Sequence, residues 1–285
     1  GFAGVPCCIE TDNVACLEAT SSVGLSLAVA KGRVDVDVVP VARDVFEYLL
    51  RMQSSDGSWA TVPVLQEAGA MTAATAGAVA AIAALASALS DEQRAYPAVE
   101  SGARWLCQMY VREGGFFDVN PRRRYGGQRS IPGLNEEATL ALLEARALAR
   151  RIGRTESELV RETLVSIAAS YEPFDHEPEY VGVAWPEDYQ FVGIPIRYRA
   201  TTAADRWIAY AWRMLLAARI ASDPGLPGRD EWACELRRLR ARIPELADRF
   251  RERPPWHIAQ VLTSAVVIRS EPEVGATLTF VDLVR

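Results

Sequence analysis

The sequence predicts an all-α fold built from stacked helical hairpins. Apolar residues recur at helical spacing through most of the chain, and strand-like alternation is nearly absent. The predicted helices come in pairs, and the linkers between them carry glycine, proline and aspartate, which is typical of stacked hairpins. We expect helices over residues 12–30, 40–53, 71–89, 95–111, 134–151, 156–171, 202–221, 229–250 and 255–269. The single short strand candidate is GRVDVDVVP, residues 32–40.

Length and composition favour one large domain over residues 1–285, with 49% hydrophobic and 24% charged residues. The net charge of -6 argues against nucleic-acid binding, which usually needs a basic face. Five cysteines without metal-type spacing and two histidines argue against a structural zinc site. With no signal-peptide pattern, we expect a cytoplasmic protein. The longest apolar run, residues 73–89, is alanine-rich and is predicted to be a buried helix.

The helix at 40–53 is followed by QSSDGSW, Gln53 to Trp59, in which Gly57 is suited to end the helix in the left-handed conformation. YLLRMQSSDGSW, residues 48–59, aligns with WLCQMYVREGGF, residues 105–116. The aligned pairs are Met52 with Met109, Asp56 with Glu113, Gly57 with Gly114, and Trp59 with Phe116. A fainter third copy ends near Phe174. The stretch is therefore predicted to close a repeated hairpin, with Gln53 and Trp59 joining neighbouring repeats rather than touching a substrate.

The QSSDGSW stretch resembles the Gln-Trp motif of class II terpene cyclases and squalene-hopene cyclases. This resemblance implies an α/α toroid, a ring or arc of helical hairpins that is also found in the β subunits of protein prenyltransferases. A second stretch, CIETDNVACLEA at residues 8–19, resembles the Asp-x-Asp-Asp motif of the same family. The matching residues are Glu10, Thr11, Asp12 and Asn13, with Glu in place of the first Asp and Asn in place of the last. The resemblance makes Asp12 the proton donor.

Protonation of an alkene or epoxide needs an undissociated carboxylic acid, whereas a free aspartate has a pKa of about 3.9. Burial and a neighbouring carboxylate both raise that value, and Glu10 is the candidate neighbour. Asn13 or Thr11 would orient the proton. The alternative is that Thr11 or Asp12 is a helix N-cap. We expect a class II terpene cyclase of the isomerase or lyase type that acts on a linear isoprenoid, taken to be a prenyl diphosphate.

A cation formed in such a cavity needs aromatic faces for stabilisation and protection from water. The segment at residues 177–199 is rich in aromatic residues, has no helical period and is long for a loop, which is typical of a functional segment. For each aromatic residue, core packing is the alternative. The candidate liners are Trp185, Tyr189, Phe191, Tyr198, Trp207, Tyr210, Trp212 and Trp256.

NPRRRYGGQR, residues 120–129, contains the densest basic cluster, with Arg122, Arg123 and Arg124 in a row. These guanidinium groups could hold a diphosphate through forked hydrogen bonds; the alternative is a solvated surface loop. No Asp-Asp-x-x-Asp run is present, so synthesis initiated by ionisation is not expected. No metal or other cofactor is indicated, except that Mg²⁺ would accompany a diphosphate substrate.

Two other hypotheses remain open. QMYVREGGF at residues 108–116 also resembles prenyltransferase β subunits, but neither His176 nor His257 has the context of their zinc ligands. A non-catalytic or degenerate toroid that serves as a binding subunit is the other hypothesis. The nine predicted helices fall short of the about twelve that six hairpins need. Three explanations stay open: an N-terminal portion is missing, a partner chain supplies the remaining helices, or the fold is reduced. A second helical domain or subunit, a homo-oligomer and peripheral membrane contact are the interactions considered.

Overall fold

The computed structural model describes residues 17–61, 70–112, 115–116, 134–170, 190–191, 194–195 and 203–241. Side chains are described for these residues except 111, 190–191, 194–195 and 203–211. The described chain is mostly helical, so the all-α prediction is confirmed. Its helices are α1 Leu17–Ala30, α2 Val39–Arg51, α3 Thr72–Leu89, α4 Glu92–Met109, α5 Leu134–Arg151, α6 Glu158–Ala169, α7 Ala203–Ser222 and α8 Arg229–Ala241. Two antiparallel pairs of two-residue strands are β1 Tyr110–Val111 with β2 Gly115–Phe116, and β3 Gln190–Phe191 with β4 Ile194–Pro195.

The predicted strand at residues 32–40 is wrong, because this segment forms the turn between α1 and α2 and the beginning of α2. The backbone N–H of Val39 donates to Asp37 Oδ1 at 3.0 Å, and Pro40 lies in the first turn, where its missing N–H costs nothing. Val34 and Val36 are exposed, so their alternation with aspartates buries no apolar face. The predicted helix at 255–269 and the end of the one at 229–250 lie outside the described residues.

The chain divides into two compact units. Unit 1 comprises residues 1–163 and 182–200, and unit 2 comprises residues 164–181 and 201–285. The prediction of a single domain over residues 1–285 stays a prediction.

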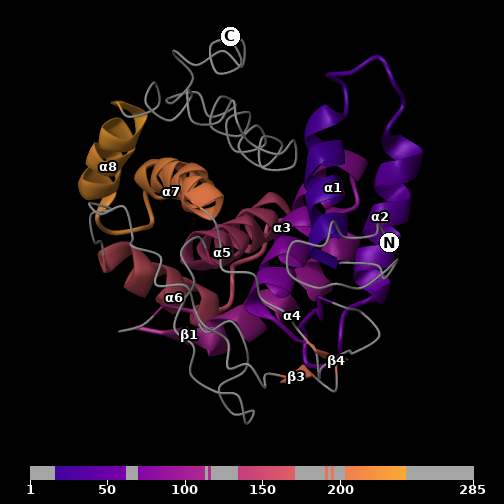
Figure 1. Ribbon diagram of the computed structural model, residues 1–285, viewed down its shortest axis with the longest axis horizontal. Coiled ribbons are helices and arrows are strands. Elements are labelled where there is room, and N and C mark those ends of the chain that lie inside the picture. Colours follow the sequence, from indigo (N-terminus) through magenta and orange to yellow (C-terminus); the bar gives the residue numbers. More distant parts are fainter. Residues whose placement is uncertain are drawn as a thin grey trace. The chain divides into compact units, whose positions relative to one another are not determined.

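α3 is the central helix of unit 1 and packs against α1, α2, α4 and α5 (Figure 1). Its sequence, TAATAGAVAAIAALASAL, is buried on nearly every side, and its small side chains let the neighbouring helices approach closely. Among the described helices, only α3 is long and apolar enough to cross a membrane, but 72% of it is buried inside the protein. The prediction of a buried core helix over residues 73–89 is thus confirmed.

Trp59 joins three helices of unit 1. It is fully buried, and its indole Nε1–H donates to the Leu49 carbonyl of α2 at 2.8 Å. Its backbone N–H donates to Thr75 Oγ1 in the first turn of α3 at 3.0 Å. Its ring lies against Gly102 of α4, where a Cβ atom would stand 2.7 Å from Trp59 Cζ3. Any larger residue at position 102 would therefore displace the indole.

Gln53 fixes the turn that carries Trp59. Its Nε2 donates to the Gly57 carbonyl at 3.0 Å, within the turn, and to the Ala98 carbonyl of α4 at 2.9 Å. Gly57 has φ +91° and lies so close to Ser101 of α4 that no side chain fits. These contacts confirm that Gln53 and Trp59 hold neighbouring hairpins together.

Phe116, the predicted counterpart of Trp59, is also buried. Its backbone N–H donates to Asn135 Oδ1 in the first turn of α5 at 2.9 Å, as that of Trp59 donates to a side chain in the first turn of α3. In the described part of the second turn, Gly115 has φ +75°, and a Cβ there would meet the Asn135 side chain. The two aromatic residues therefore occupy matching places in the two repeats.

Unit 2 uses a tryptophan in a similar way. Trp232 of α8 is buried, and its Nε1–H donates to the Ala168 carbonyl at the end of α6 at 3.0 Å. Gly228, with φ +71°, approaches the same carbonyl, which a Cβ would meet at 2.8 Å. Arg213 of α7 stacks over the Trp232 ring and lies 3.4 Å from the buried carboxylate of Glu235. The indole, the glycine and this ion pair together fix α8 against α6 and α7.

We expect Gly57→Ala to destabilise the protein well beyond the cost of backbone strain alone. Gly153 provides the control, because it also has a left-handed φ of +69° but would place a Cβ in open space. Gly153→Ala should cost about 1–2 kcal/mol of unfolding free energy, whereas at Gly57 the Cβ would also lie 2.7 Å from the Ser101 carbonyl oxygen. Urea denaturation measures both changes, and equal losses would show that the contact with α4 can relax.

Candidate functional site

Three helices of unit 1 begin at the same place. A Cβ on Gly77, in the second turn of α3, would stand 3.3 Å from Ser21 Cβ of α1 and 3.8 Å from Glu137 Oε1 of α5. Because Ser21 and Glu137 also lie near the starts of their helices, α1, α3 and α5 have their N-terminal ends together. We call Glu18, Ser21, Thr61, Gly77 and Glu137 the N-terminal cluster.

Thr61 holds the first turn of α1. Its carbonyl accepts from the Leu17 N–H at 3.0 Å, and its hydroxyl donates to Glu18 Oε1 at 2.9 Å. The same hydroxyl lies 3.1 Å from Met71 Sδ, so its single proton has two acceptors. Thr61 follows Trp59 by two residues in the sequence, and the repeat turn thereby positions the beginning of α1.

Glu18 is an acidic side chain in an environment that favours its neutral form. Burial raises the pKa of the Glu18 carboxyl above its usual range, and the weaker effect of the Thr61 hydrogen bond acts in the opposite direction. Glu18 and Ser21 are three residues apart on α1, so their side chains lie on one face of the helix. The cluster therefore includes a carboxyl that keeps its proton to a higher pH than a free glutamate.

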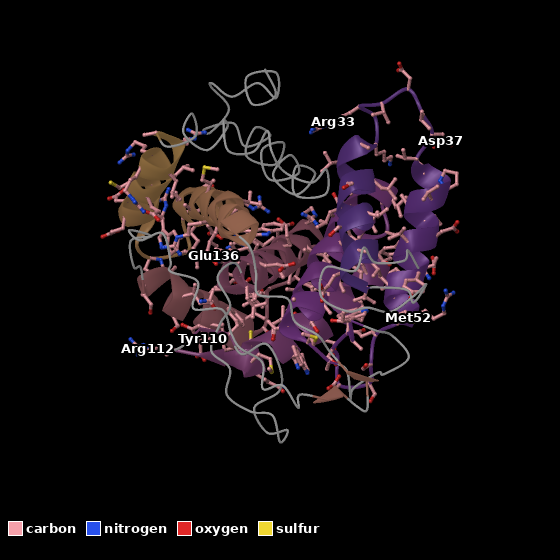
Figure 2. All side chains as sticks on the ribbon, viewed as in Figure 1. Arg33, Asp37, Met52, Tyr110, Arg112 and Glu136 are labelled. Carbon is pink, nitrogen blue, oxygen red and sulfur yellow. The ribbon has the colours of Figure 1, made fainter. Side chains whose placement is uncertain are left out.

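Two glutamates begin α5 beside this face. Glu136, which is labelled in Figure 2, is buried, and Glu137 Oε1 would lie 3.8 Å from a Cβ on Gly77. Acidic side chains in the first turn of a helix interact favourably with the exposed backbone N–H groups. Figure 2 also shows Met52 and Asp37 at opposite ends of α2. The end of α2 at Met52 leads into the Gln53–Trp59 turn and so to the cluster.

Hydrogen bonding and proton transfer are the chemistry that these groups can perform. Ser21 Oγ is buried and has no hydrogen-bond partner among the described residues, although buried hydroxyls are normally bonded. In the part of the chain that the structure describes, no three His, Cys, Asp or Glu side chains gather as metal ligands would. The described part of the cluster is thus a set of proton donors and acceptors.

Most of the site residues predicted from the sequence lie outside the described residues. These are Glu10, Asp12, Asn13, Arg122, Arg123, Arg124, Trp185, Tyr189 and Tyr198. Phe191 is placed by its backbone in β3 of unit 1. Trp207 and Tyr210 are placed by their backbones, three residues apart on α7 of unit 2. The predicted aromatic lining therefore stays a prediction.

Sequence reasoning did not identify the N-terminal cluster. Glu18 carried a usable signal, because it is the one charged residue of α1 and closely follows the Glu10–Asn13 motif. Thr61 and Glu137 carried none, since both come from distant parts of the sequence.

Comparison with protein-family models, with curated proteins and with solved structures finds no match for this chain in any of the three. The function of this chain is therefore proposed from its residues alone.

We expect Glu18→Gln to become more stable relative to the wild type as the pH rises. With a folded-state pKa above the unfolded value near 4.5, Glu18 contributes stability that is fully present below pH 4.5 and is lost as the pH rises through the folded pKa. Glutamine still accepts from Thr61 but never ionises. Urea midpoints at about pH 4 and about pH 8 measure the change. The exposed Glu162→Gln is the control; a Glu18→Gln difference that does not change with pH would contradict the expectation.

Proposed function

We propose that this protein is a protonation-initiated terpene cyclase of class II, built as an α/α toroid, with Asp12 as its general acid. Its substrate would be a linear isoprenoid that carries a diphosphate. The observation that supports this proposal best is the Gln53–Trp59 turn, because its contacts recur at Phe116 and extend through Thr61 to the start of α1. α1 is the helix that follows the ETDN motif.

Asp12 is close in the chain to the start of α1, which carries Glu18 and Ser21 of the N-terminal cluster. Asp12 precedes Leu17 by five residues, and a five-residue segment spans at most about 18 Å. Glu18 illustrates the condition that the reaction requires, since burial at this end of α1 keeps a carboxyl protonated to a higher pH. Similar surroundings at Asp12 would supply the undissociated acid.

In the proposed reaction, the Asp12 carboxyl gives its proton to an alkene carbon. The alkene electron pair forms the new C–H bond and leaves a tertiary cation, which the next alkene attacks to form a ring. The last cation loses a proton or takes up water, and the proton returned to Asp12 closes the cycle. Glu10 and Asn13 would position the acid, and the aromatic residues of the segment at 177–199 would stabilise the cations.

A non-catalytic toroid is the second candidate. Glu10 and Asn13 replace two of the aspartates that the family motif carries, which is the observation in its favour. Such a protein would bind an isoprenoid or a partner subunit without turning it over.

Asp12→Asn should lower cyclisation by at least the 100- to 10,000-fold typical of a general acid, because asparagine keeps the shape but has no proton to give. Glu10→Gln should cost less, since Glu10 only tunes Asp12. The assay is product formation from farnesyl diphosphate, geranylgeranyl diphosphate and squalene, with urea midpoints to check folding. Full activity in Asp12→Asn would remove the proposed mechanism, and no product from any substrate would favour the non-catalytic toroid.

Replacing Arg122, Arg123 and Arg124 together with alanine should raise KM for a diphosphate substrate and leave KM for squalene unchanged. The reason is that only the diphosphate offers oxygens for forked guanidinium contacts. Steady-state kinetics with both substrates make the comparison. Equal KM values for the triple variant and the wild type would assign these arginines to a solvated surface.

A further inference from the structure

Met71 brings a sulfur atom to the hydroxyl that holds Glu18. Its Sδ lies 3.1 Å from Thr61 Oγ1, and Glu18 Oε1 lies 2.9 Å from the same oxygen. The backbone keeps Met71 in this place, because its N–H donates to the Trp59 carbonyl at 3.2 Å. Among the methionines whose side chains the structure describes, it is the one whose sulfur accepts a hydrogen bond from a hydroxyl. The Thr61 hydroxyl therefore couples this sulfur to the carboxyl.

The two acceptors compete unequally for the single proton of the Thr61 hydroxyl. A thioether sulfur accepts hydrogen bonds only weakly, so with unoxidised Met71 the hydroxyl donates mainly to the Glu18 carboxyl. This hydrogen bond lowers the pKa of Glu18 against the larger rise that burial causes. A change that makes Met71 a better acceptor should therefore withdraw the hydroxyl from Glu18 and let the pKa of Glu18 rise further.

Oxidation of Met71 makes such a change. A hydroperoxide transfers one oxygen atom to the sulfur: the O–O bond breaks, an S–O bond forms, and the peroxide leaves as an alcohol or as water. The sulfur loses two electrons, which the peroxide gains. The sulfoxide oxygen carries a partial negative charge and accepts hydrogen bonds more strongly than the sulfur did. Met71 is partly exposed, whereas Met109 is 2% exposed, so a peroxide can reach Met71 from the solvent.

We propose that Met71 is a peroxide-sensitive modification site whose sulfoxide draws the Thr61 hydroxyl away from Glu18. The oxidised protein keeps the backbone hydrogen bond from the Leu17 N–H to the Thr61 carbonyl, so the first turn of α1 stays in place. It loses the side-chain hydrogen bond that ties Glu18 to the segment after Trp59. The oxidation state of one sulfur thereby sets the acidity of a carboxyl at the start of α1. This inference does not depend on cyclase activity.

Packing alone would explain an apolar side chain at position 71 but gives no role to its sulfur. Leucine has nearly the volume of methionine and carries no acceptor, so Met71→Leu separates the two explanations. If Met71 only packs, this change leaves the pKa of Glu18 as it is. If the sulfur takes part of the Thr61 hydrogen bond, the change returns all of it to Glu18 and lowers that pKa.

The experiment follows two signals in the whole chain during treatment with hydrogen peroxide. Mass spectrometry of peptides locates the sulfoxides, and we expect oxidation at Met71 before Met109. NMR titration of isotope-labelled glutamate side chains gives the pKa of Glu18, whose signal the Glu18→Gln variant identifies. We expect this pKa to rise on oxidation and to fall back after treatment with methionine sulfoxide reductases.

Met71→Leu and Thr61→Val are the control variants, with urea midpoints to check folding. The first removes the oxidised atom and the second the hydroxyl, so the pKa of Glu18 should not respond to peroxide in either. Met52, which is also partly exposed, stays oxidisable in both and controls for oxidation elsewhere. Should Thr61→Val not fold, Met71→Leu decides alone.

Three results would overturn the proposal. One is a folded protein in which peroxide leaves Met71 unoxidised. Another is a pKa of Glu18 that does not rise when wild-type Met71 is oxidised, and the third is an equal rise in Met71→Leu. No substrate enters these measurements, so this proposal and the cyclase proposal fail independently.

Discussion

The burial of Trp59 is the constraint on which unit 1 depends. A buried indole N–H must find an acceptor, and the Leu49 carbonyl near the end of α2 provides it. The indole ring packs directly against Gly102 of α4, where no side chain stands in its way. The backbone N–H of Trp59 donates to Thr75 of α3. One residue thus contacts three helices, and α3, most of whose side chains are apolar, is enclosed by its neighbours.

The same turn connects stability to the candidate site. Thr61 emerges from the Trp59 segment and bonds both Leu17 and Glu18, so the start of α1 is fixed by backbone and side chain together. Asp12, if it is the proton donor proposed above, would need such a rigid support. The element that joins the repeats therefore also supports the helix that follows the ETDN motif.

Among the described residues, the buried and partly buried polar groups include two contrasting kinds. Arg146 with Glu156, and Arg213 with Glu235, are charged pairs at 3.0 and 3.4 Å, whose attraction offsets part of the cost of removing both charges from water. Glu18 and Ser21 differ, because the first receives a hydroxyl in place of a cation and the second has no partner among the described residues. Polar groups of the second kind are where ligand chemistry is expected, since their hydrogen bonds are not all committed to the fold.

The sequence by itself determined the helices of the described residues, to within a few residues at their ends, and the role of the repeat turn. Periodicity placed α5 at residues 134–151, and the alignment of Trp59 with Phe116 anticipated their matching contacts. Periodicity failed at residues 32–40, where Asp37 and Pro40 favour a helix start over a strand. Only the tertiary structure decided the N-terminal cluster, because Ser21, Gly77 and Glu137 are brought together by the packing of α1 and α5 on α3. Local sequence patterns cannot show which faces of distant helices will meet. The raised pKa of Glu18 and the buried, unbonded hydroxyl of Ser21 arise only from that packing.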